Sequence, residues 1–167
     1  MAVITTNVIG GAGENLTALR LEKDGYFKVY FLGEKAPIED FLLEILDETH
    51  PYHCLLQVKS TGKNNRYQVC GNINTPVPDD KLEKLINRPL PTYVVGADIE
   101  EEVVFIAPAN DKKRRYPSIP TGFRLDNKDK DQRIANLEKL RDEIIRYWEE
   151  SGILDYKYNR FKSALGV

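Results

Sequence analysis

The 167-residue chain is poor in the residues on which several protein classes depend. Two cysteines and two histidines are too few for a disulfide framework, and neither histidine has the companion motif of a Ser-His-Asp hydrolase. A zinc site is disfavoured too, because His53 and Cys54 are neighbours in an expected strand and point to its opposite faces. The cysteines are therefore expected to be ordinary reduced thiols.

Long apolar runs are also absent. The longest runs hold four or five apolar residues, whereas a membrane-spanning helix needs about 20. The stretch from Met1 to Gly13 has no cationic start followed by an apolar segment, so no signal peptide is expected. These absences predict a cytoplasmic protein with no membrane association.

The third absence is an excess of charge of one sign. The chain has 24 Lys and Arg against 26 Asp and Glu, a net charge of −2, which disfavours a broad basic face for nucleic acid. A local basic groove is compatible with this balance. The side chains expected to contact phosphates are Lys63, Arg66, Lys112, Lys113, Arg114 and Arg115. The alternative for each of them is a place in a solvated loop.

The residues that are present predict one domain, 1–167, in which helix and strand patterns alternate. A flexible glycine-rich loop at 10–13 is expected before a short helix at 14–23, and Asp79 or Asp80 is expected to cap a helix at 79–87. The expected strands cover 26–31, 38–46, 52–60, 92–97 and 103–106, with 66–70 as a candidate for a further short strand and 129–150 as the last helix. This order predicts an α/β fold with a mixed central sheet flanked by helices.

The last expected helix carries an apolar stripe that includes Trp148. Such a stripe at helical spacing is typical of a face that packs on the core. The alternative is an interface with a second copy of the chain, which would make the protein a homodimer. Because this helix ends in Glu149 and Glu150, it is not expected to dock on DNA.

Four polar residues are hard to explain by folding alone. Asp40 lies within an expected core strand, and Gln57 and Lys59 lie two positions apart in the next strand, so both point to the same face. Glu14 belongs to the first expected helix, which must pack on that sheet. If the two strands are neighbours, these side chains converge. They would then offer oxygen ligands to a divalent cation such as Mg²⁺, beside an ammonium group that stabilises charge on a phosphodiester.

The element order and three short segments resemble a known superfamily of nucleases. The segments are Gly13-Glu14, Ile38-Glu39-Asp40-Phe41 and Gln57-Val58-Lys59-Ser60, and the superfamily is PD-(D/E)xK, the restriction-endonuclease-like nucleases. More narrowly, the chain is similar to the bacterial family called domain of unknown function 4365, also over 91–98. The resemblance covers 10–106 and implies a restriction-endonuclease-like αβββαβ core. A basic, proline-containing loop at 107–127 and an added C-terminal helix at 128–150 follow this core.

The resemblance implies a nuclease that uses Mg²⁺ or Mn²⁺ to hydrolyse DNA phosphodiester bonds, in defence against foreign DNA or in mobile-element biology. Asp40, Gln57 and Glu14 would hold the metal, with Gln57 where the strict motif has an acid, and Lys59 would be the catalytic lysine. Either Glu39 or Asp40 is the site acid, and the family pattern favours Asp40. Because nuclease-like folds also serve as inert modules, the alternative function is a catalytically silent domain that binds nucleic acid or a protein partner.

Overall fold

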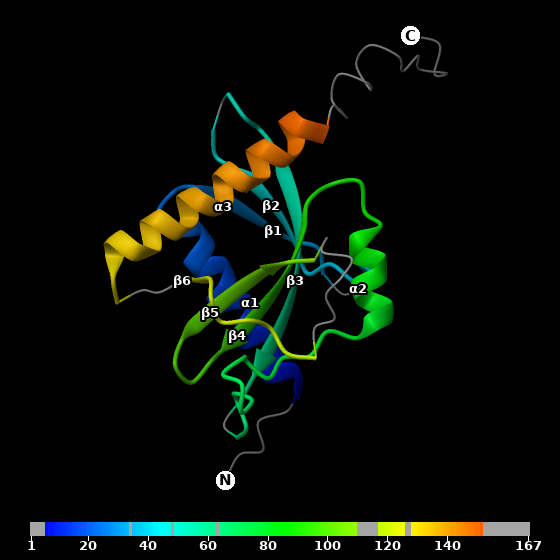
Figure 1. Cartoon of the computed structure of the whole chain (residues 1–167), viewed down its shortest axis with the longest axis vertical. Helices are drawn as coiled ribbons and strands as arrows, with labels where there is room; N and C mark the ends of the chain where they lie inside the picture. The colour runs from blue at the N-terminus through cyan, green and yellow to red at the C-terminus, as the bar shows by residue number, and fades with distance from the viewer. Residues whose placement is uncertain are drawn as a thin grey trace.

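The structure is a computed structural model that describes residues 6–151 except 34, 48, 63, 110–116 and 126–127. A six-stranded mixed sheet has helices against both faces, which confirms the predicted α/β class (Figure 1). In chain order the elements are α1 (Thr6–Glu22), β1 (Phe27–Phe31), β2 (Phe41–Ile45), β3 (His53–Thr61), α2 (Asp79–Ile86), β4 (Thr92–Asp98), β5 (Val103–Pro108), β6 (Arg124–Leu125) and α3 (Lys130–Ser151). The predicted succession of helix, three strands, helix and strand is present, and a C-terminal helix is added to it.

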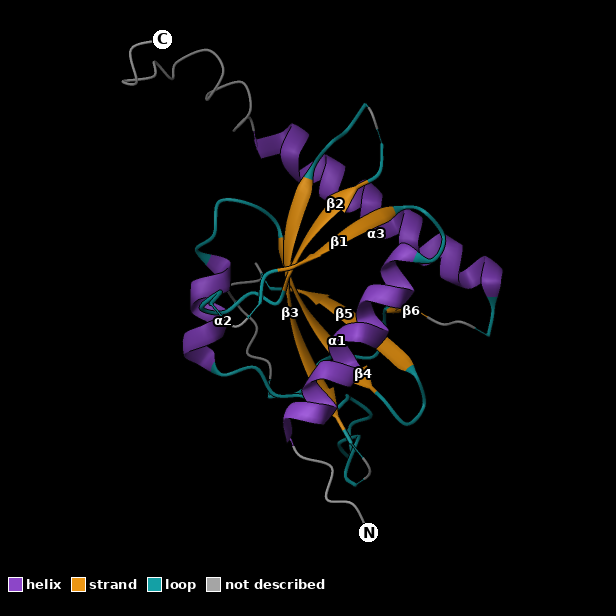
Figure 2. Ribbon diagram, turned by 180° about the vertical axis from the view of Figure 1, so that it is seen from behind, coloured by secondary structure: helices purple, strands orange, loops and turns teal. Residues whose placement is uncertain are grey.

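The strands lie in the sheet in the order in which they occur in the chain. β1, β2 and β3 form one antiparallel meander, and β4, β5 and β6 form another. The parallel pair of β3 and β4 joins the two meanders, and the chain between these strands crosses over through α2 (Figure 2). A parallel pair needs such a crossover, because a hairpin joins only antiparallel strands.

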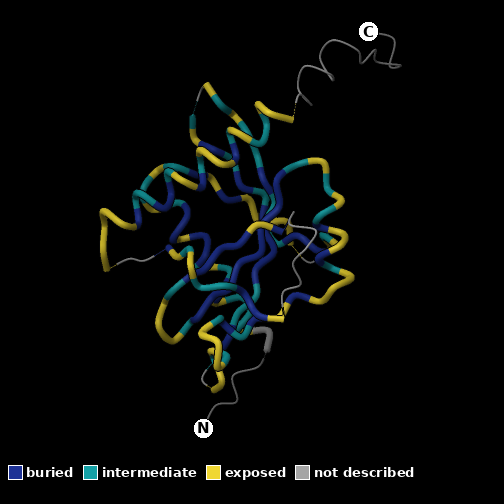
Figure 3. Tube along the Cα trace, in the orientation of Figure 1, coloured by how far each residue is buried: buried dark blue, intermediate teal, exposed yellow. Residues whose placement is uncertain are grey.

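Each face of the sheet has an apolar core of its own. α1 and α3 cover one face, where β3 contributes Leu56 and Val58, and α2 covers the other face, into which it buries Leu85. The strands between these layers are the most buried part of the chain (Figure 3). Because side chains alternate along a strand, Gln57 and Lys59 point to the face that α2 covers.

The first helix is longer than predicted. α1 begins at Thr6, so the glycine-rich segment 10–13 is helical, and the prediction of a loop there is wrong. Gly13 lies so close to β3 that a Cβ atom at this position would be 1.7 Å from Ser60 Oγ. Packing of α1 against the sheet offsets the low helix propensity of glycine, which is about 1 kcal/mol less favourable than alanine.

The second helix begins directly after Pro78, which is its N-cap residue. Asp79 and Asp80 lie in the first turn, and no side-chain cap hydrogen bond is formed at this described helix end, so the predicted cap is wrong. Acidic side chains in the first turn still favour the helix, because they lie near the positive end of its dipole.

Two short segments also differ from the prediction. The segment 66–70 is not a strand and contributes only an isolated bridge between Tyr67 and Ile73. The two-residue strand β6 lies inside the predicted loop 107–127, where it pairs with β5. Neither segment has the length from which a periodic pattern can be recognised.

The described residues include both cysteines, and neither is in a disulfide: Cys54 is buried and Cys70 is exposed. Burial raises the pKa of the Cys54 thiol far above its ordinary range, which makes that thiol unreactive. In the ranges that the structure describes, no helix is both long and apolar enough to cross a membrane.

Candidate active site

The sheet forks where β2 and β3 meet. Pairing between these strands stops at Phe41 and Leu56, and one further hydrogen bond runs from the Asp40 N–H to the Leu56 carbonyl over 2.9 Å. β3 continues to Thr61, and in the described part of the chain it pairs there only with β4. The edge of β3 is therefore open from Gln57 onward. Asp40 lies at the fork, one residue before β2 rather than inside it as predicted.

A pocket of about 580 Å³ opens at this fork, and all four residues singled out in the sequence line it. Asp40 comes from the segment before β2, Gln57 and Lys59 come from β3, and Glu14 comes from α1. Lys81 of α2 is the fifth ionisable or amide side chain of the pocket lining. The pocket joins carboxylate, ammonium and carboxamide groups from segments that lie far apart in the chain.

Asp40 faces the pocket, whereas its neighbour Glu39 has another partner. Glu39 is buried and accepts a hydrogen bond from the Arg88 guanidinium. Asp40 Oδ2 accepts the Val58 N–H at 2.6 Å, which fixes this carboxylate at the edge of β3. Burial raises the pKa of Asp40, despite this hydrogen bond and the nearby ammonium of Lys59. The negative charge of Asp40 is therefore only partly compensated by the protein.

Gln57 contributes an unsatisfied oxygen atom at the same place. Its side chain is buried, and its Nε2 donates a hydrogen bond to the Ile38 carbonyl at 2.9 Å. Its Oε1 is buried and has no hydrogen-bond partner in the described part of the chain. Exchanging the two amide atoms would set Oε1 against the Ile38 carbonyl, so the donor contact decides the orientation. An unsatisfied buried acceptor costs about 1–3 kcal/mol, a cost that a bound ligand would remove.

Glu14 reaches the pocket because α1 lies close to the sheet. A Cβ atom at Gly13 would be 1.7 Å from Ser60 Oγ and 3.3 Å from Ala97 Cβ, so any larger residue would push α1 outward together with Glu14. Burial raises the pKa of Glu14, and the charge of Asp40 raises it further. Two partly buried carboxylates that repel each other favour the binding of a cation.

Two lysines bring positive charge to the pocket from different elements. Burial lowers the pKa of Lys59, the charge of Lys81 lowers it further, and the charge of Asp40 opposes both effects. Among the described residues, no carboxylate lies within ion-pair distance of either ammonium. Sequence reasoning did not select Lys81, because only the docking of α2 on the sheet distinguishes it from Lys84 on the same helix.

The predicted nucleic-acid contact Arg66 is engaged within the protein. Its Nη1 is 3.0 Å from Asp98 Oδ1 and its Nη2 is 3.3 Å from Glu101 Oε1, and Asp98 is completely buried. Arg66 therefore anchors the loop after β3 to the end of β4. The other predicted contacts, Lys63, Lys112, Lys113, Arg114 and Arg115, lie outside the described residues.

The donor atoms at the fork fit a hard divalent cation. Glu14 and Asp40 offer carboxylate oxygens and Gln57 offers an amide oxygen, and Mg²⁺ prefers a few such oxygen ligands together with water. No group of three or more His, Cys, Asp and Glu residues that could hold a metal is found in the described ranges. Any metal at this site would depend on the amide oxygen of Gln57 in place of a third acid.

Comparisons of the chain with family models, with curated proteins and with solved structures gave no match. The assignment of a function therefore depends on the residues of the pocket and on their chemistry.

Proposed function

We propose that the protein is a metal-dependent nuclease that hydrolyses phosphodiester bonds of DNA at the fork between β2 and β3. The observation that carries this proposal is the unsatisfied buried Oε1 of Gln57, a residue that lines one pocket together with Asp40, Glu14 and Lys59. Oxygen ligands next to a free ammonium are the groups that cation-assisted attack on a phosphate ester requires.

In this proposal Asp40, Glu14 and Gln57 would hold Mg²⁺ or Mn²⁺. When bound, the cation supplies Lewis acidity, which polarises the phosphate and lowers the pKa of a coordinated water. Asp40 is oriented for this role by the Val58 N–H. A cation would also remove the repulsion between Asp40 and Glu14 that raises the pKa of Glu14. Folding of the chain around these carboxylates thus stores free energy that favours binding of the cation.

Lys59 acts on the phosphate itself. Its ammonium, free of ion pairs among the described residues, donates hydrogen bonds to the attacking water or to a non-bridging oxygen, where negative charge increases in the transition state. Water adds to phosphorus, the ester P–O bond breaks, the water loses a proton and the leaving alkoxide gains one. Lys59 is well placed for this role because it follows Gln57 by two residues and shares its face of β3.

A substitution at Lys59 tests the proposal. Plasmid and linear DNA, single- and double-stranded, are incubated with the protein and Mg²⁺ or Mn²⁺. We expect cleavage by the wild type and a loss of about 100-fold or more in Lys59→Ala. The exposed Lys84→Ala serves as the matched control and should cleave normally. Both variants should unfold within about 0.5 kcal/mol of the wild type, as is usual for substitutions outside the core.

The variant Gln57→Glu, which restores the acid of the strict motif, distinguishes an enzyme from a silent module. Gln57→Glu adds one negative charge to the ligand set, so it should tighten metal binding and keep or raise the rate of cleavage. If neither the wild type nor Gln57→Glu cleaves any of these DNA substrates, the proposed activity is wrong. The alternative function, a silent module that binds nucleic acid or protein, then takes its place, and the neutral Gln57 is the residue that favours it.

A further inference from the structure

Of the described charged side chains that line the pocket, only Lys81 has no part in the proposed mechanism. It belongs to the first half of α2 and lines the pocket together with Asp40 and Lys59. Its charge acts on both of these groups. Folding therefore places a second ammonium next to Lys59 without an ion pair among the described residues to compensate it.

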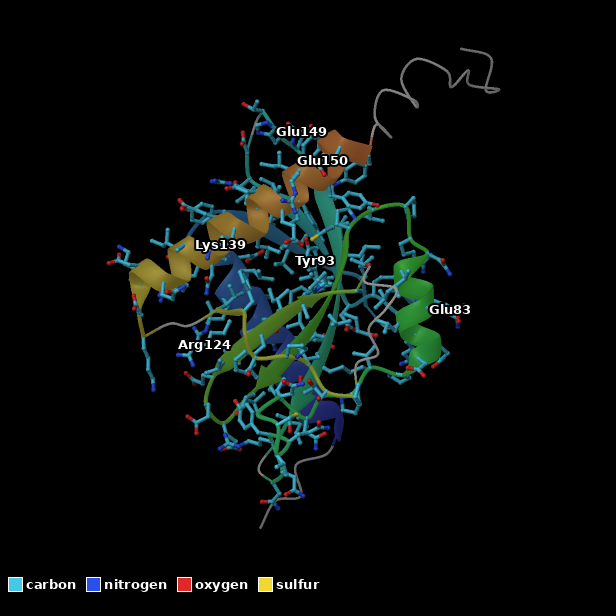
Figure 4. All side chains as sticks on the ribbon, in the orientation of Figure 1. Glu83, Tyr93, Arg124, Lys139, Glu149 and Glu150 are labelled. Carbon is cyan, nitrogen blue, oxygen red and sulfur yellow. The ribbon has the colours of Figure 1, made fainter. Side chains whose placement is uncertain are left out.

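The packing of α2 determines which of its charges reaches the pocket. Leu82 and Leu85 are buried against the sheet, which places Lys81 at the pocket and leaves Glu83 and Lys84 exposed. Figure 4 shows Glu83 on the side of α2 that points away from the sheet. Of these three charged side chains of α2, only Lys81 therefore lines the pocket, and Glu83 and Lys84 point into solvent.

With a divalent cation bound, the charges of the pocket balance when a dianion is included. The carboxylates of Glu14 and Asp40 cancel the ammoniums of Lys59 and Lys81, so a bound divalent cation would leave two positive charges. A phosphodiester carries one negative charge and an attacking hydroxide carries another. Their transition state is therefore a dianion, which matches the charge of the metal-loaded pocket when both lysines are counted.

We infer that Lys81 contacts the phosphate of the bound nucleic acid and is the second phosphate-binding lysine of the site. This inference rests on the proposed function and adds a substrate-binding role for α2. Lysine suits the role because its ammonium is a point charge on a flexible stem, which can follow a phosphate as its geometry changes. Lys59 on β3 and Lys81 on α2 would then approach the phosphate from two different walls of the pocket.

Lys81→Ala and Lys84→Ala form a matched pair, since each removes one lysine from α2 and only Lys81 lines the pocket. The first measurement is kcat/KM for DNA cleavage in Mg²⁺. The second is binding of a fluorescein-labelled DNA duplex with Ca²⁺ in place of Mg²⁺. We expect Lys81→Ala to lose about tenfold or more in kcat/KM and to bind the duplex more weakly. Lys84→Ala should match the wild type in both, and Lys81→Arg should recover part of the loss.

A third measurement, the rise in melting temperature that Mg²⁺ produces, tests whether Lys81 has only a structural role. Lys81→Ala should keep that rise or increase it, since a positive charge next to the cation has been removed. If Lys81→Ala behaves like Lys84→Ala in both cleavage and duplex binding, the inference is wrong, even though the proposed nuclease function stands. If the wild type does not cleave but its duplex binding depends on Lys81, the function is wrong and the phosphate contact stands.

Discussion

At the scale of single residues, the buried charge of Asp40 lowers the stability of the folded protein. Burial raises its pKa above the ordinary value of 3.8, so the folded protein binds this proton more tightly than the unfolded chain does. Without metal, the free energy of unfolding must therefore fall as the pH rises from about 3.8 through the raised pKa. Glu14, whose pKa is raised from 4.5, likewise makes the free energy of unfolding fall as the pH rises.

Asp40→Asn should remove this cost and keep an oxygen that can accept the Val58 N–H. In EDTA at pH 7 we expect the variant to melt at or above the temperature of the wild type, and this difference should disappear as the pH falls below 3.8. Mg²⁺ should raise the melting temperature of the wild type but not that of the variant. Thermal melts across pH, with and without Mg²⁺, test both statements. A variant that is less stable than the wild type at neutral pH would show that the buried charge of Asp40 does not destabilise the folded protein.

At the scale of elements, the glycines of α1 have two different roles. Gly13 is required for contact, because a Cβ atom there would be 1.7 Å from Ser60 Oγ. Gly11 lines the pocket, and a Cβ atom there would meet nothing within 4 Å. Glycine at 11 therefore lowers the stability of the helix without any packing reason, and it keeps this wall of the pocket open.

Gly11→Ala and Gly13→Ala should thus change stability in opposite directions. Alanine at 11 should stabilise the protein by up to about 1 kcal/mol, the difference in helix propensity. Alanine at 13 should destabilise it by about 1–3 kcal/mol, as is typical of overpacking, and should reduce the metal response because Glu14 moves with α1. Urea denaturation of the two variants is the measurement, and equal effects of one sign would show that α1 does not lie against β3.

A buried ion pair between Arg133 and Asp24 connects α3 to the turn after α1. Arg133 Nε is 2.6 Å from Asp24 Oδ2, and the Arg133 side chain is 5% exposed. The hydrogen bond from Arg133 lowers the pKa of Asp24 below 3.8. The stabilisation that this ion pair provides is therefore present above pH 3.8, and it is lost as the pH falls through the lowered pKa of Asp24.

Asp24→Asn should cost about 1.5–3 kcal/mol at pH 7, the range for hydrogen bonds to charged groups. The difference from the wild type should shrink in acid, where Asp24 is protonated. The exposed pair of Asp142 and Arg141 supplies the control, since Asp142→Asn should cost at most about 1 kcal/mol. Chemical denaturation at pH 7 and in acid checks the prediction, and a cost that grows toward low pH would refute it.

The elements that could be predicted from the sequence are those with a clear local pattern. Aromatic and β-branched residues indicated β1, and the two-residue period of a strand placed Gln57 and Lys59 of β3 on one face. The helical glycines at 10–13 were missed, because tertiary packing of α1 overrides local propensity. The bond between Arg88 and Glu39, which turns Glu39 away from the pocket, connects residues 49 positions apart and leaves no local pattern.

At the scale of the whole molecule, the pocket exists because the sheet is made of two meanders that meet at one parallel pair. β3 extends beyond its antiparallel neighbour β2, and among the described strands its last residues pair with β4 alone. The pocket at this free edge is lined by residues of α1 and α2. A long-range arrangement of this kind determines that Glu14 and Lys81 meet Asp40. The sequence suggested Glu14 because the first expected helix must pack on the sheet, and it contained no indication of Lys81.

The proposed function requires Glu14, Asp40 and Gln57 to share one divalent cation at this fork. A crystal structure with Mn²⁺, located by its anomalous scattering, would show whether they do. We expect one Mn²⁺ in the pocket with an Asp40 carboxylate oxygen and Gln57 Oε1 at coordination distance, about 2 Å, and with Glu14 bound directly or through water. Crystals that hold Mn²⁺ elsewhere, or that leave Gln57 Oε1 without a cation at millimolar Mn²⁺, would contradict the claim.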